Sequence, residues 1–156
     1  MLSTFKSFFE NNLKGTSTLE SEDATKQLNL ACAALMIEVM NSDHQLDERE
    51  EAEFLDILKS SLGVSQDAII ELKMLAEKQA KEATSLYEFT RLINDHYDYE
   101  QKTVLIENMW RIAFSDDNLD KYEDHLIRKV SELIYVSHSD FIKSKLKVRG
   151  SKGFEK

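Results

Sequence analysis

Two short stretches of the chain carry carboxylates in the same order, and these are the side chains whose spacing could do chemistry. Residues 42–50 read SDHQLDERE and residues 115–123 read SDDNLDKYE, so the second stretch follows the first by 73 residues. Serine, aspartate, leucine, aspartate and glutamate coincide at positions 1, 2, 5, 6 and 9. Because each stretch follows an apolar segment and opens an amphipathic one, the match indicates an internal duplication with pseudo-symmetric halves.

Four of the repeated acids have a purely structural interpretation. In each stretch, an aspartate and the glutamate three residues later fit a capping box, in which two side chains satisfy backbone N–H groups at a helix start. Carboxylates at that position also interact favourably with the helix dipole. The interpretation applies to Asp47 with Glu50 and to Asp120 with Glu123.

The other two repeated acids, Asp43 and Asp116, need a different explanation. Each follows the C-terminal end of an apolar segment, where the dipole of a helix disfavours negative charge, so a cation should offset it. Oxygen ligands suit hard ions such as Ca²⁺, Mg²⁺ or Mn²⁺. If pseudo-symmetry brings the two stretches together, six carboxylates face one divalent cation, and these are Asp43, Asp47, Glu50, Asp116, Asp120 and Glu123.

The spacing is not that of an EF-hand calcium loop. Lys121 stands where that loop requires glycine, and Ile127 stands where it requires a bidentate glutamate. On spacing alone, a cation site and a set of helix caps with solvated acids are equal alternatives.

The elements that must position these acids are helices. The chain has no proline and only four glycines, so the residues that punctuate strands and tight turns are nearly missing. Apolar residues recur at helical spacing over about 23–41, 47–62, 85–95, 99–114, 120–135 and 139–148, with a further helix opening after Ser65. We therefore predict one all-α domain at residues 23–148, a bundle of seven to eight helices in two pseudo-symmetric halves.

Both ends of the chain differ from this domain. The spacing of apolar residues predicts an amphipathic helix over residues 1–14, and with a polar linker we expect it to make an N-terminal unit at residues 1–22. Its charge is balanced, which favours docking on its own domain over lying on a membrane surface. Residues 149–156 are a basic tail, for which a solvated terminus is favoured over contact with an anionic membrane or an acidic partner.

Composition excludes several function classes. The net charge of −9 disfavours a nucleic-acid partner. Cys32 is the only cysteine, which fits a reducing cytoplasm, and its apolar surroundings indicate an inert core thiol. No stretch reaches the length of a transmembrane helix. The chain lacks a serine-triad context, a phosphate-binding glycine loop and a zinc-protease motif, so an enzyme is the weaker hypothesis.

The repeated pattern resembles the tellurite-resistance TerB family. The likeness lies in a small residue followed by aspartate, a short turn, a leucine, and an acidic helix start with glutamate three residues later, and it covers about residues 23–146. Where the family usually has Ala-Asp-Gly, this chain has Ser-Asp-His at residues 42–44 and Ser-Asp-Asp at 115–117. The resemblance implies metal binding at the six acidic positions and a non-enzymatic role in bacterial chemical stress.

A protein-interaction module is the competing function. TerB-like domains also accompany membrane-associated co-chaperones, which implies an adaptor in the cytoplasm or at the periphery of the inner membrane. In this reading the acids are caps and surface charge that meet a basic protein partner, and the aromatic residues Tyr97, Tyr99, Trp110 and Tyr122 lie near a contact surface. The sequence leaves open whether the chain forms a homodimer.

Overall fold

The computed structural model describes residues 17–42, 47–115 and 119–151, with side chains from residue 24 to residue 150. This part of the chain folds into helices only, which confirms the all-α prediction. In chain order the helices are α2 (Ser17–Asn41), α3 (Glu48–Ser60), α4 (Gln66–Glu82), α5 (Tyr87–His96), α6 (Tyr99–Phe114), α7 (Lys121–Leu133) and α8 (His138–Ser151). The predicted helix at residues 1–14 lies outside the described residues.

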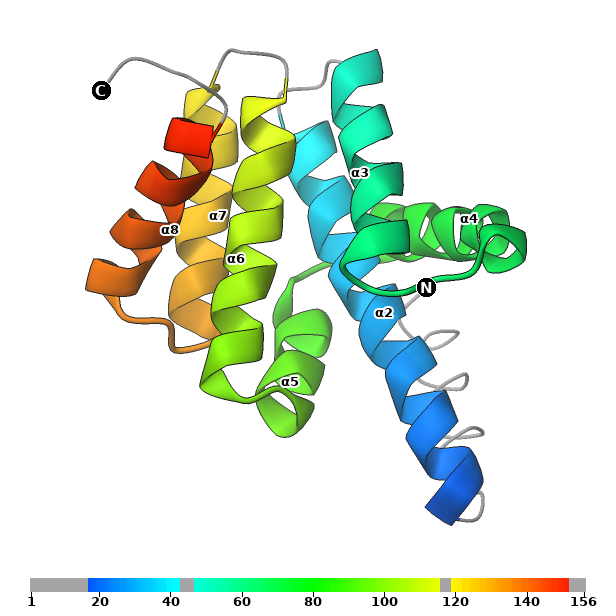
Figure 1. Ribbon diagram of the computed structural model, residues 1–156. Coiled ribbons are helices and arrows are strands. Elements are labelled where there is room, and N and C mark those ends of the chain that lie inside the picture. The colour runs from blue at the N-terminus through cyan, green and yellow to red at the C-terminus, as the bar shows by residue number, and fades with distance from the viewer. Residues whose placement is uncertain (1–16, 43–46, 116–118, 152–156) are drawn as a thin grey trace.

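The internal duplication is present in the helix boundaries. Helices α3 and α7 each have 13 residues and begin 73 residues apart, and the ends of α2 and α6 are separated by the same interval. Helix α4 packs on α2 in the first half, as α8 packs on α6 in the second. Figure 1 shows α2 and α6 side by side at the centre of the bundle. In the order of the chain, α5 comes between the two repeated halves.

The hydrophobic core lies where the two halves meet. Helix α2 contributes a continuous buried run at residues 30–37, because it is covered on one side by α3 and α4 and on the other by α5 and α6. The repeat extends to the core, since Phe54 and Ile57 of α3 and their equivalents Ile127 and Val130 of α7 are all fully buried. Both halves therefore contribute matching positions to one core.

The structure corrects the predicted ends of two helices. Helix α2 begins at Ser17, so the second half of the predicted polar linker is helical. This stretch lacks glycine and proline and contains leucine and glutamate, which are good helix formers. Helix α8 runs to Ser151, so the first residues assigned to the basic tail belong to it. The turn after α3 contains Gly63 at a φ of 66°, the left-handed conformation that glycine commonly adopts after the end of a helix.

Among the residues that the structure describes, no helix combines the length and the apolar composition that crossing a bilayer requires.

Candidate functional site

The two acidic junctions begin with serines that make the same contacts. The hydroxyl of Ser42 donates to the carbonyl of Val39 at 2.8 Å, and the hydroxyl of Ser115 donates to the carbonyl of Ile112 at 2.7 Å. The backbone N–H of each serine donates to that same carbonyl, at 3.3 and 3.2 Å. Each serine thus satisfies a carbonyl in the last turn of its helix, which ends α2 and α6 in the same way.

The aspartates that open α3 and α7 are N-caps, as predicted. The Asp47 carboxylate accepts the N–H of Arg49 at 2.8 Å, and the Asp120 carboxylate accepts the N–H of Tyr122 at 2.6 Å. Hydrogen bonds from Arg49 hold the pKa of Asp47 below its usual value. Asp120 also forms a complete capping box with Glu123, whose carboxylate accepts the Asp120 N–H at 3.3 Å.

The glutamates at the third position of these helices are buried, although a capping role alone does not require a buried carboxylate. Glu50 is 1% exposed and Glu123 is 0% exposed, although both stand in the first turn of a helix beside a loop. Burying a carboxylate costs free energy unless hydrogen bonds, an ion pair or a metal compensates for the lost water. Equal burial at the two equivalent positions indicates a shared role for these side chains.

Each junction is also connected by an ion pair to the helix that follows it. The Lys73 ammonium of α4 donates to Glu51 of α3, and the Lys145 ammonium of α8 donates to Asp124 of α7 at 2.8 Å. Glu51 and Asp124 are one residue beyond the buried glutamates in their respective helices. The contact with Glu51 raises the pKa of Lys73. These two ion pairs repeat between the halves and fix the helix starts that carry the acids.

Both junctions lie at one end of the bundle. Figure 1 shows the C-terminal ends of α2 and α6 and the N-terminal ends of α3 and α7 at the same end, so the helix starts that carry the four described acids lie there. Asp43 and Asp116 lie outside the described residues. Within residues 17–42, 47–115 and 119–151, no group of three or more histidine, cysteine or acidic side chains is close enough to hold a metal ion.

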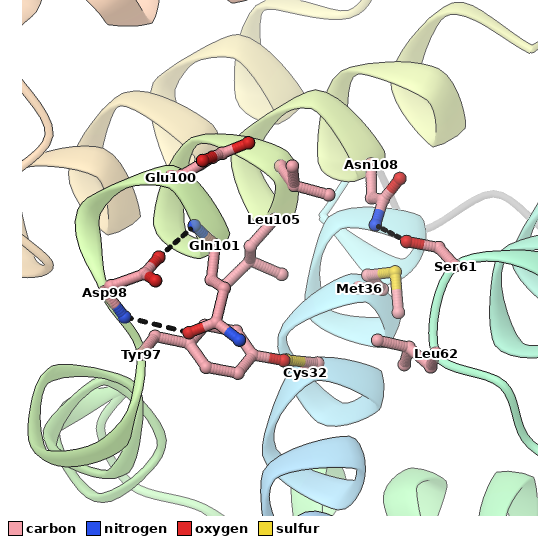
Figure 2. Close-up of a pocket in the computed structure, with 11 residues that line it drawn as sticks. Cys32, Met36, Ser61, Leu62, Tyr97, Asp98, Glu100, Gln101, Leu105 and Asn108 are labelled. Atoms are coloured by element: carbon pink, nitrogen blue, oxygen red, sulfur yellow. Dashed lines mark hydrogen bonds between the residues drawn. The ribbon is translucent and has the colours of Figure 1, made fainter.

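A pocket of about 260 Å³ between α2, α6 and the end of α3 is a feature that we did not predict. At its mouth Asp98 and Gln101 form the capping box that opens α6, with bonds of 2.8 and 2.9 Å. In another part of the lining, the Asn108 amide donates to the Ser61 hydroxyl at 2.9 Å (Figure 2). The Asp-x-x-Gln pattern at residues 98–101 is the one sequence signal for this pocket, and it marks only the helix start.

Cys32 lines this pocket as an unreactive thiol. Its sulfur lies 3.3 Å from the Tyr97 hydroxyl, and burial raises the pKa of the thiol to about 12. Burial also raises the pKa of Tyr97. A raised pKa disfavours the nucleophilic thiolate, and the complete burial of Cys32 confirms that it belongs to the core.

The four aromatic residues proposed to lie near a contact surface differ in burial. Trp110 is buried against Phe114 and Phe141, so it belongs to the core, because the helix face that carries it is covered by α8. Tyr97 is partly buried against that core. Tyr99 and Tyr122 are exposed and come from different helices.

The comparison with known families adds an independent observation. The family model described as tellurite resistance protein TerB matches residues 29–146, a range that includes both acidic junctions and the bulk of the chain. No curated protein and no solved structure gives a significant match. Because the match spans all the helices that carry the repeat, the chain belongs to the tellurite-resistance TerB family.

Proposed function

We propose that this protein binds a divalent cation, Ca²⁺, Mg²⁺ or Mn²⁺, at the acidic end of its bundle and acts in bacterial resistance to tellurite-type stress without catalysis. Buried Glu50 and Glu123 and the neighbouring Asp43 and Asp116 are the proposed ligands. Asp47 and Asp120 complete the oxygen-rich set while they cap their helices.

One observation carries this proposal: two carboxylates are buried at equivalent positions at the same end of the bundle. A cation compensates for the lost hydration of such groups, and oxygen donors are what hard divalent ions prefer. Helix starts fixed by caps and by cross-helix ion pairs provide a rigid frame for those donors. A bound ion would supply the positive charge that draws the two halves together at this end.

The test is thermal unfolding of EDTA-treated protein titrated with Ca²⁺, Mg²⁺ and Mn²⁺. A cation at about 100 times its dissociation constant stabilises the folded state by about 2.7 kcal/mol. We expect a saturable rise in Tm for one of these ions, and its loss in the double variant Asp43→Asn, Asp116→Asn and in Glu50→Gln, Glu123→Gln.

Glu48→Gln with Asp67→Asn is the matched control, since it removes two exposed acids from the first turns of α3 and α4. This control should keep the whole cation response. A Tm unchanged by every ion would overturn the cation proposal. The stress role is tested by growth on tellurite of a sensitive bacterial strain that expresses the natural chain or the Asp43→Asn, Asp116→Asn variant.

The competing function, an adaptor for a protein partner, is favoured by one specific observation. Ile70 and Met74 are one turn apart on α4 and are 70% and 65% exposed, which presents an apolar strip to the surroundings. Such a strip suits a partner helix. Replacing both residues with serine should abolish capture of a protein partner and leave any cation response unchanged.

A further inference from the structure

Beyond cation binding, the molecule has a groove with an apolar floor between α2 and α4. It encloses about 500 Å³ and is floored by Leu30 of α2, Val64 of the turn after α3, and Leu72 and Leu75 of α4. The last three side chains are only partly buried, so the groove leaves apolar surface for another element to cover.

We propose that residues 1–14 of the same chain return along α2 as a helix and fill this groove. The segment carries five large apolar residues at helical spacing, and these are Leu2, Phe5, Phe8, Phe9 and Leu13. Their number and spacing match a groove that has an apolar floor and runs beside a helix.

The length of the segment fits the distance it has to cover. Helix α2 begins at Ser17, and Figure 1 shows its first turns projecting beyond the rest of the bundle. From Ser17 to Leu30 the rise along α2 is about 20 Å, and a helix of 14 residues is about 21 Å long. An antiparallel return therefore brings Leu2 level with Leu30 and Phe5 level with Lys26, and both Leu30 and Lys26 line the groove.

The connection also fits this arrangement. Residues 15 and 16 give a loop of the length found in short helical hairpins, and Gly15 permits the reversal.

A membrane surface is the weaker destination for the segment. Residues 1–14 contain two lysines and one glutamate, a net charge of +1, whereas attachment to anionic lipid is strengthened by each added basic residue. The groove offers apolar burial without requiring that electrostatic attraction.

The test introduces pairs of cysteines into the full-length chain. Phe5→Cys with Leu72→Cys should form a disulfide within one chain under mild oxidation. Phe5→Cys with Leu146→Cys is the matched control, because Leu146 is exposed on α8, on the far side of the bundle from α4 (Figure 1), and this pair should stay reduced. Native Cys32 is fully buried and should not compete. Equal oxidation of both pairs, or disulfide-linked dimers from the Leu72 pair, would overturn the proposal.

A second measurement does not depend on disulfide formation, so it holds even where the cysteine substitutions weaken the packing of the segment. Alkylation of the introduced thiol in Leu72→Cys should become about tenfold faster when Phe5→Ser and Phe8→Ser are added, because the segment no longer covers it. Alkylation of Leu146→Cys should not change. If the two serine substitutions leave the Leu72→Cys rate unchanged but abolish binding to vesicles of anionic and zwitterionic phospholipid, the segment is a membrane anchor and the proposal is wrong.

Discussion

At the scale of single residues, each junction combines a structural acid with a buried one. The Asp120 carboxylate accepts backbone N–H groups at the start of α7, and the Glu123 carboxylate in turn accepts the backbone N–H of Asp120. We expect Asp120→Ala to lower the free energy of unfolding by about 1 kcal/mol, the usual cost of losing an N-cap. Asp120→Asn should keep most of that stability, because asparagine caps helices equally well. Urea unfolding measures both, and equal losses in the two variants would contradict a capping role.

The other cap predicts a dependence on pH. Hydrogen bonds from Arg49 lower the pKa of Asp47 in the folded state below the ordinary value of 3.8. A carboxyl whose pKa is lowered by folding stabilises the protein above its unfolded pKa, and this contribution is lost as the pH falls through the folded value. The Tm difference between the natural chain and Asp47→Asn should therefore be constant from pH 5 to 7, within about a degree, and should shrink below about pH 4. A difference that persists in stronger acid would show that charge on Asp47 is not its source.

At the scale of helices, the repeated ion pairs connect each acidic junction to the next helix. Asp124 and Lys145 lie 2.8 Å apart with both side chains 22% exposed, and the Lys145 ammonium also lies 5.2 Å from the centroid of the Trp110 ring. We expect a double-mutant cycle with alanine to give a coupling of about 1 kcal/mol, at the upper end for partly exposed pairs. Lys145→Ala should cost more than Asp124→Ala, because it also removes the contact with the ring.

The control for this cycle is the pair of Arg91 and Asp95 on the surface of α5. Its two charges are 3.9 Å apart and both side chains are well exposed. Its coupling should be smaller, a few tenths of a kcal/mol. Equal coupling in the two pairs would contradict the view that α7 and α8 are held together by a partly desolvated contact.

Helix boundaries also show how far sequence reasoning reaches. Helix α6 runs over the predicted residues, Tyr99–Phe114, because its cap, its apolar run and the acidic turn after it all agree. The start of α2 was wrong because the residues before it are polar, and polar composition alone does not separate a solvated helix from a linker. Burial of Glu50 and Glu123 was not predicted either, since it depends on how α3 and α7 pack against the central helices.

At the scale of the whole molecule, the duplicated sequence predicted two related halves but not the spaces between them. The pocket beside Cys32 and the groove between α2 and α4 depend on where helices cross, which the spacing along one helix does not specify. The position of Trp110 has the same origin, because α8 covers the face of α6 that carries it. Local patterns therefore predict elements and repeats here, whereas cavities follow from tertiary packing.

The contact between α2 and α6 predicts that the two halves unfold together. Phe54 of α3 is fully buried in the first half, and Phe54→Ala should cost about 3–5 kcal/mol through lost packing and a cavity. Trp110, the only tryptophan, lies in the second half and reports on it by fluorescence. If the shared core makes one cooperative unit, Phe54→Ala lowers the Tm seen by Trp110 fluorescence as much as the Tm seen by far-UV circular dichroism. Met74→Ala is the control, since Met74 is exposed and its truncation leaves no cavity. A Trp110 transition that stays in place while the circular dichroism transition moves would mean that each half folds as a separate unit, and the duplicated junctions would then no longer be held in one frame.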